Sequence, residues 1–178
     1  MKAIGFKQHL DIKNPSSLID FETKRPKPNG HDLLVRVKSV SVNPVDIGVR
    51  KNEKGILKQP KIIGWDAYGV VEEIGPQVTL FSSGDRVFYA GSFIRSGSDS
   101  EYQLVDERIV GYAPKNLTDD EIAEMPLTSL TAYEGLFEQM KLTFNKSKNK
   151  GKTILIINGT GGVGSVATQL ANLAGFTV

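Results

Sequence analysis

The stretch Thr153-Ile-Leu-Ile-Ile-Asn-Gly-Thr-Gly-Gly-Val-Gly164, near the end of the 178-residue sequence, decides the fold. A β-branched apolar run, residues 153–158, leads into glycines spaced G-x-G-x-x-G, and a helical pattern follows. This order predicts a strand, a tight turn and a helix whose first N–H groups and positive dipole end face an anion. We expect a dinucleotide pyrophosphate to bind at Gly159, Thr160, Gly161, Gly162, Val163 and Gly164.

The three spaced glycines are expected to have separate roles. Gly159 allows the tight turn out of the strand, Gly161 lets a pyrophosphate approach the backbone, and Gly164 lets the helix pack close to the strand. A plain tight turn is the alternative, because a G-x-G-x-x-G pattern by itself is weak. Its place between a strand and a helix favours dinucleotide binding.

The residues after the glycines predict a helix with one apolar face and a glycine end at Gly175. That face is formed by Val163, Val166, Ala167, Leu170, Ala171 and Ala174. Residues 176–178 are expected to begin a second parallel strand. A complete dinucleotide domain needs two βαβ halves, and the acidic residue expected about 20 positions past the glycines is not in this sequence. We therefore expect a truncation, or a tail that pairs with another chain.

Composition excludes several classes of function. The 22 basic and 20 acidic residues are mixed along the chain, which argues against a nucleic-acid surface or a polybasic membrane patch. The sequence has no cysteine, so disulfides, thiolate metal sites and a cysteine nucleophile are excluded. With no apolar signal core and no stretch of membrane-spanning length, a cytoplasmic location is the default expectation.

The upstream sequence predicts a different layer architecture. Short apolar runs separated by Gly and Pro indicate a closed or partly closed all-β unit up to about residue 115. A capping box from Thr118 to Glu121 then opens a helix, and a second helical run is expected from Leu127 to about Lys141. We place the domains at 1–120 and 121–178, with a polar connector at 145–151.

Asn43 and Asp46 are the candidate polar site residues of the first domain. They lie in Val42-Asn-Pro-Val-Asp46, where a predicted strand over residues 32–43 ends and Pro44 begins a helical turn. An N-cap or Asx-turn is the alternative for both. Trp65 either lines a substrate cleft or belongs to the core.

Four segments together resemble the medium-chain dehydrogenase/reductase superfamily, in its quinone oxidoreductase-like branch often labelled zinc-type alcohol dehydrogenase-like. The match covers the whole sequence, which is about half of the family's usual length. It implies a GroES-like β-barrel domain followed by the first part of an α/β Rossmann domain, an active site in the cleft between them, and a homodimer. By itself such a chain is expected to bind cofactor weakly and turn over little. The segments are Val42–Asp46, Gly64–Gly75 with Gly84–Val87, Pro126–Gly135, and Gly159–Gly164.

The departures from the family pattern bear on metal binding. Zinc-dependent members carry Cys where this sequence has Asn43, and Gly-His-Glu where it has Gly64-Trp65-Asp66; a third ligand near Leu127 is also absent. Because tryptophan and leucine do not bind zinc, we predict no metal. The resemblance then implies an NADP(H)-dependent reductase, with NAD(H) not excluded, that transfers hydride to a quinone or α,β-unsaturated carbonyl.

The resemblance also implies roles for individual residues. Asn43 would donate to the substrate oxygen or fix the nicotinamide carboxamide, and Asp46 would hold the local structure. Thr128 and Thr131 would contact the nicotinamide half of the cofactor, unless they only cap the helix. The competing functions are a non-catalytic nucleotide-binding module, a structural module, and a zinc-type alcohol dehydrogenase.

Overall fold

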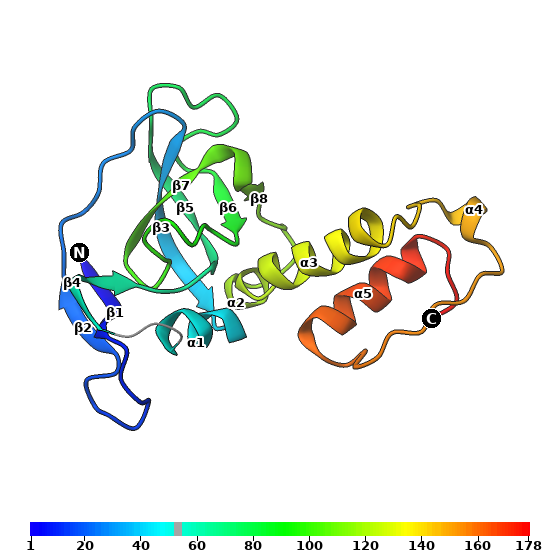
Figure 1. The fold of residues 1–178 in the computed structure, drawn as a ribbon. Coiled ribbons are helices and arrows are strands. Elements are labelled where there is room, and N and C mark those ends of the chain that lie inside the picture. Colours follow the sequence, from blue (N-terminus) through cyan, green and yellow to red (C-terminus); the bar gives the residue numbers. More distant parts are fainter. Residues whose placement is uncertain (52–54) are drawn as a thin grey trace. The chain divides into compact units, whose positions relative to one another are not determined.

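A computed structural model describes residues 1–51 and 55–178, and its contacts divide the chain into two compact units, Met1–Pro126 and Leu127–Val178. None of the helices in the described residues is long and apolar enough to cross a membrane. Figure 1 labels the strands and the α-helices. The elements are β1 (Lys2–Gln8), β2 (Ile19–Glu22), β3 (Asp32–Ser41), α1 (Pro44–Lys51), β4 (Ile56–Ile62), β5 (Asp66–Ile74), β6 (Arg86–Tyr89), β7 (Tyr102–Asp106), η1 (Glu107–Ile109), β8 (Gly111–Tyr112), α2 (Asp119–Ala123), α3 (Pro126–Tyr133), η2 (Glu134–Gln139), α4 (Lys146–Asn149) and α5 (Gly162–Leu173).

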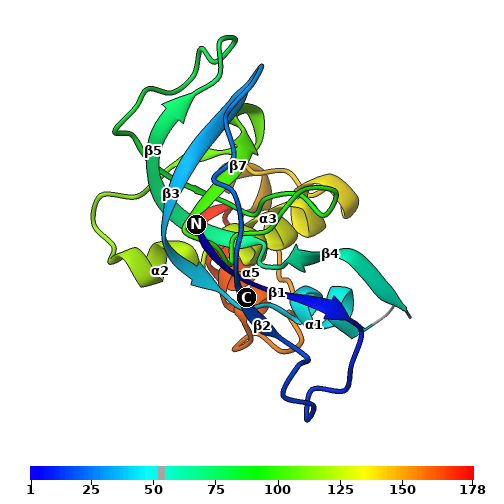
Figure 2. The ribbon, with the colours of Figure 1, turned by 90° about the vertical axis from the view of Figure 1, so that its left-hand side faces the viewer.

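The first unit consists of two antiparallel sheets, in agreement with the predicted β domain. One has the strand order β2-β1-β4 and the other β7-β3-β5-β6-β8. Figure 2 shows β3 between β5 and β7, and β1 beside β2. Strand β4 was not assigned from the sequence. It is an edge strand with the sequence Ile-Leu-Lys-Gln-Pro-Lys-Ile and mostly exposed or half-buried side chains, so it shows neither alternation nor a continuous apolar run.

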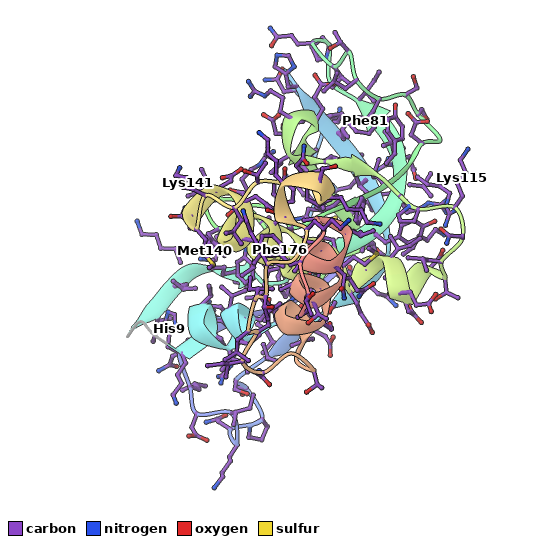
Figure 3. The ribbon with its side chains drawn as sticks, turned by 90° about the vertical axis from the view of Figure 1, so that its right-hand side faces the viewer. His9, Phe81, Lys115, Met140, Lys141 and Phe176 are labelled. Atoms are coloured by element: carbon purple, nitrogen blue, oxygen red, sulfur yellow. The ribbon has the colours of Figure 1, made fainter. Side chains whose placement is uncertain are left out.

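The core of the first unit lies against β3 and β5. Leu33, Val35, Val71 and Val105 are all at most 2% exposed, and Phe81, labelled in Figure 3, packs with them. The predicted alternation along β3 is wrong in its first half, where residues 33–35 are all buried. Successive strand side chains point to opposite faces, so this half of β3 is covered on both sides.

The helices that join the two units follow their local sequence signals. The predicted capping box at α2 is confirmed, because Thr118 accepts from the Glu121 backbone and Glu121 accepts from the Thr118 backbone. The predicted run from Leu127 is confirmed as α3 followed by the π-helical stretch η2, which ends at Gln139. Along this run Leu130 and Met140 are exposed, whereas Ala132 and Leu136 are buried.

The predicted strand 153–158 does not form in the second unit. Thr153 makes one parallel bridge with Thr177, and the side chains of Leu155 and Ile157 are both 86% exposed. A β-strand forms when its backbone hydrogen-bonds to a neighbouring strand along its length. Among the described residues, only the short segment 176–178 pairs with this run. The parallel direction of the single bridge is the one predicted for a βαβ unit.

Helix α5 is confirmed and packs on α3, beside which it lies in Figure 1. Gly175 follows its C-cap with φ +97°, as expected for a helix-ending glycine.

The polar connector 145–151 is not simply a loop, because it contains the short helix α4, capped by Asn145. The buried Asn149 at its end donates from Nδ2 to the carbonyls of Thr143 and Ala174, at 2.7 and 2.8 Å. Phe176, labelled in Figure 3, packs in the same unit with Ala171 and Ala174.

Candidate cofactor loop and polar site

The glycine loop of the second unit turns at Asn158. This residue has φ +59°, the left-handed conformation that asparagine tolerates better than most side chains. Its carbonyl accepts from the Gly161 amide at 3.0 Å, and α5 begins at Gly162 with Gly161 as N-cap. The expected anion site consists of a strand, a tight turn and the first turn of a helix. The turn and the 12-residue helix are present, whereas the strand is not.

The glycines of the motif differ in how much space surrounds them. A Cβ at Gly164 would lie 2.8 Å from the Cα of Gly159 and would also overlap the Asn158 carbonyl oxygen, so the helix packs closely against the turn as expected. At Gly161 the Cβ would lie 2.7 Å from Nδ2 of Asn158. At Gly159 the nearest atoms would be 3.5 Å away or more. The residue with positive φ in this turn is Asn158 and not Gly159.

The two candidate threonines of α3 have different surroundings. Thr128 lies against the glycine loop, because a Cβ at Gly162 would be 3.1 Å from its Cγ2. The Thr131 hydroxyl donates to the Leu127 carbonyl at 2.7 Å, one turn earlier in the same helix. Thr131 thus adopts the common bonding pattern of a helical threonine, although its oxygen can still accept a hydrogen bond.

In the first unit, the pairing of β3 with β5 brings Asn43 to Asp66. Ser41 and Asp66 are register partners, so the chain that leaves β3 passes beside the start of β5. Nδ2 of Asn43 donates to Oδ2 of Asp66 at 2.8 Å, and Asp66 is fully buried. The Asn43 backbone amide donates to Oδ2 of Asp46 at 2.5 Å, while the Asp46 amide donates to the Asn43 carbonyl at 3.0 Å. Asn43 and Asp46 thus form the turn that starts α1, and Asn43 is also linked to β5.

Burial raises the pKa of two carboxyl groups in this region, Asp46 and Asp99. Burial raises the pKa of Asp46, although the backbone amides of Asn43 and Gly64 act in the opposite direction. Burial and the nearby charge of Asp46 raise the pKa of Asp99 to about 6. Oδ1 of Asp99 lies 2.5 Å from where a Cβ of Gly64 would be, and Gly64 has φ +100°. Asp99 was not a sequence candidate, because it lies in a Gly/Ser loop far from the other residues.

Trp65 belongs to the core, the second of its two predicted roles. It is 1% exposed and packs edge-on against Phe93, with ring centroids 5.3 Å apart. The described residues contain no group of three or more His, Cys, Asp and Glu side chains that could hold a metal ion. The possible zinc donors here are the side-chain amide of Asn43, which already bonds to Asp66, and the single carboxylate of Asp66. The indole of Trp65 does not bind zinc, so these residues are a poor donor set for that metal.

A hollow of about 710 Å³ in the first unit lies away from these residues. It is lined by parts of β1, β2, β3 and residues 98–101, and none of the predicted site residues lines it.

Comparison with known proteins identifies the family. Residues 29–126 match the alcohol dehydrogenase GroES-like domain. This chain belongs to the medium-chain dehydrogenase/reductase superfamily. Its relatives place it in the quinone oxidoreductase-like branch of that superfamily and among oxidoreductases.

Three members of the superfamily illustrate the likeness. A zinc-type alcohol dehydrogenase-like protein of Staphylococcus aureus is 49% identical over 178 residues, which are 100% of this chain and 52% of that protein. A 2-methylene-furan-3-one reductase of Solanum lycopersicum is 38% identical over 78% of this chain and 36% of its own length. The solved quinone oxidoreductase of Escherichia coli in complex with NADPH has a TM-score of 0.80 and 25% identity, covering 99% of this chain and 51% of that one. The chain thus spans about half the length of the S. aureus relative.

Proposed function

We propose that the chain carries the β domain and the dinucleotide-binding loop of a zinc-independent NAD(P)H-dependent oxidoreductase that reduces quinones or α,β-unsaturated carbonyls. The observation that carries this proposal is the glycine loop, in which α5 begins inside G-x-G-x-x-G and Gly164 packs against the turn. The NADPH complex of the E. coli quinone oxidoreductase and the enone reductase of Solanum lycopersicum support the cofactor and the substrate class.

The chain's own residues would hold the dinucleotide at two places. The backbone amides from Gly159 to Gly164 would bind the pyrophosphate, helped by the positive end of the α5 dipole. Thr128 and Thr131 remain candidates for contacts with the nicotinamide half, and Asn43 for a contact at the nicotinamide itself. Asp46 would keep the Asn43 turn in place.

Hydride chemistry fits the donor groups better than zinc chemistry. Without a suitable zinc donor set, an alcohol would lack the Lewis acid that stabilises its alkoxide. A bound reduced nicotinamide would supply a hydride to the β-carbon of an enone, and a proton from water would complete the reduction while the dinucleotide leaves oxidised. A conjugated acceptor is already electrophilic, so hydrogen bonds to its oxygen are enough to support this step.

The test is oxidation of NADPH, followed by its absorbance, with a quinone and an enone as acceptors and in the presence of a metal chelator. The proposal predicts turnover, slow for this chain by itself, that the chelator does not change. Alcohol oxidation that is lost on chelation would overturn it. Saturable NADPH binding with no reduction of either acceptor would favour the non-catalytic nucleotide-binding module.

A further inference from the structure

The turn that leads into the glycine loop contains an asparagine followed directly by a glycine. Asparagine is a chemically labile residue, and it is most labile before glycine, which has no Cβ to shield its backbone nitrogen. The sequence contains two such pairs, Asn29-Gly30 in the first unit and Asn158-Gly159 in the second. Their surroundings differ, so each pair is a reference for the other.

The pair Asn29-Gly30 is held by three hydrogen bonds. The Gly30 amide, whose nitrogen would attack the side chain, donates to Oδ1 of Asn29 at 2.9 Å. The Asn29 carbonyl accepts from the Asp32 amide at 3.0 Å, and the Gly30 carbonyl accepts from the Gln77 amide at 3.0 Å. Rotation of the peptide between Asn29 and Gly30 disrupts these bonds.

The pair Asn158-Gly159 is held less firmly. The Gly161 amide donates to the Asn158 carbonyl at 3.0 Å, and Gly164 packs on the same carbonyl. Among the residues that the structure describes, the Gly159 amide and the exposed side-chain amide of Asn158 make no hydrogen bond. The preceding run 153–158 has no strand ladder to hold its backbone, since its one bridge is at Thr153.

We propose that Asn158 is a site of spontaneous deamidation and that its product weakens dinucleotide binding at the glycine loop. The Gly159 nitrogen bonds to Cγ of Asn158 and loses its proton, while the bond from Cγ to Nδ2 breaks and Nδ2 leaves as ammonia. Water then opens the cyclic imide at either of its two carbonyls, which gives aspartate or isoaspartate.

The effect on binding follows from where the new carboxylate lies. Nδ2 of Asn158 is 2.7 Å from the position that a Cβ of Gly161 would take, and Gly161 is the N-cap of α5. A carboxylate here repels a pyrophosphate and competes with it for the positive end of the helix. This step rests on the proposed function, because it requires a dinucleotide at the loop.

The first experiment follows both pairs in one sample of the chain, incubated at mildly alkaline pH. After digestion, the peptides that contain Asn29 and Asn158 are separated by liquid chromatography, and mass spectrometry detects aspartate and isoaspartate. In the folded protein we expect Asn158 to deamidate about tenfold faster than Asn29 or more, the effect of roughly two hydrogen bonds. In urea the two rates should become similar.

The matched variant is Gly159→Ala, whose methyl group would find its nearest neighbours at 3.5 and 3.6 Å. It should slow deamidation at Asn158 and leave the rate at Asn29 unchanged. Equal rates at Asn158 and Asn29 in the folded wild type overturn the inference, whether or not the chain binds a dinucleotide.

The second experiment compares NADPH binding by Asn158→Asp and Asn158→Gly in calorimetric titrations. Both residues tolerate the positive φ of this position, and only one is charged. We expect Asn158→Asp, and the deamidated wild type isolated by ion exchange, to bind NADPH about tenfold more weakly than Asn158→Gly, with a smaller difference at high salt. Equal affinities overturn the effect on binding and leave the proposed function intact. No NADPH binding by the fresh wild type overturns the proposed function and this effect together.

Discussion

Replacing Gly164 by alanine tests whether the glycine loop is set by close packing of α5 against the turn. The new methyl group would lie 2.8 Å from Gly159 Cα and would overlap the carbonyl oxygen of Asn158. Both neighbours are backbone atoms, which cannot rotate away as a side chain can. Overpacking of this kind costs about 3 kcal/mol, and alanine recovers about 1 kcal/mol relative to glycine in a helix.

We therefore expect Gly164→Ala to lower the free energy of unfolding by about 2 kcal/mol and to weaken NADPH binding at least tenfold, because the α5 N-terminus must shift. The matched control is Gly159→Ala, whose methyl group would find its nearest neighbours at 3.5 and 3.6 Å. At ordinary contact distance it should change stability by no more than about 0.5 kcal/mol. Urea unfolding followed by circular dichroism, together with NADPH titration, makes the comparison. Equal stability and equal affinity of the two variants would refute the packing argument.

Three further predictions concern buried polar groups. Asn149→Ala removes two hydrogen bonds, to the carbonyls of Thr143 and Ala174, of which, among the described residues, only the Thr143 carbonyl keeps another donor, the Asn145 amide. It should lower the free energy of unfolding by about 2 kcal/mol in urea titrations, and an unchanged midpoint would count against a stabilising role of Asn149. The pKa of Asp99 is raised, so the folded protein favours the protonated carboxyl group. Asp99→Asn should therefore raise the melting temperature at pH 7. This gain should shrink as pH falls from about 6 toward 4, where the wild-type carboxyl group becomes protonated. A gain in melting temperature that does not change with pH would contradict the raised pKa of Asp99. Burial of Glu107 raises its pKa, but hydrogen bonds from His31 and two backbone amides outweigh burial and lower it, so Glu107→Gln should reduce the melting temperature at neutral pH. This loss should diminish as pH falls below about 4, and a constant loss would indicate a purely steric effect.

Local signals were sufficient to predict where several helices begin. The capping box at Thr118, the helix start at Pro44 and the helix after Gly161 each depend on a few neighbouring residues, and each appears in the structure. The superfamily and the fold class followed from such segments taken together. The domain boundary between residues 120 and 121 stays a prediction. The two compact units of the structure divide after Pro126.

Features that depend on pairing between distant segments could not be predicted from local sequence patterns. The run 153–158 has strand-like composition, but a ladder requires a neighbouring strand, and only one bridge to Thr177 forms. Strand β4 pairs through its backbone at a sheet edge and carries no periodic pattern.

At the candidate site, the contact between Asn43 and Asp66 joins residues 23 positions apart and follows from the register of β3 with β5. The left-handed turn at Asn158 did have a local signal, the dipeptide Asn-Gly, which favours such turns.

The most direct test of the account is a titration of the ¹⁵N-labelled protein with NADPH, followed by the amide NMR signals. This measurement detects weak as well as tight binding, and it assigns the binding to residues. We predict saturable shifts centred on Gly159 to Gly164 and on Thr128, and their loss in Gly164→Ala. Shifts absent from the glycine loop at NADPH concentrations up to several millimolar would contradict the dinucleotide-binding assignment on which the proposed oxidoreductase function depends.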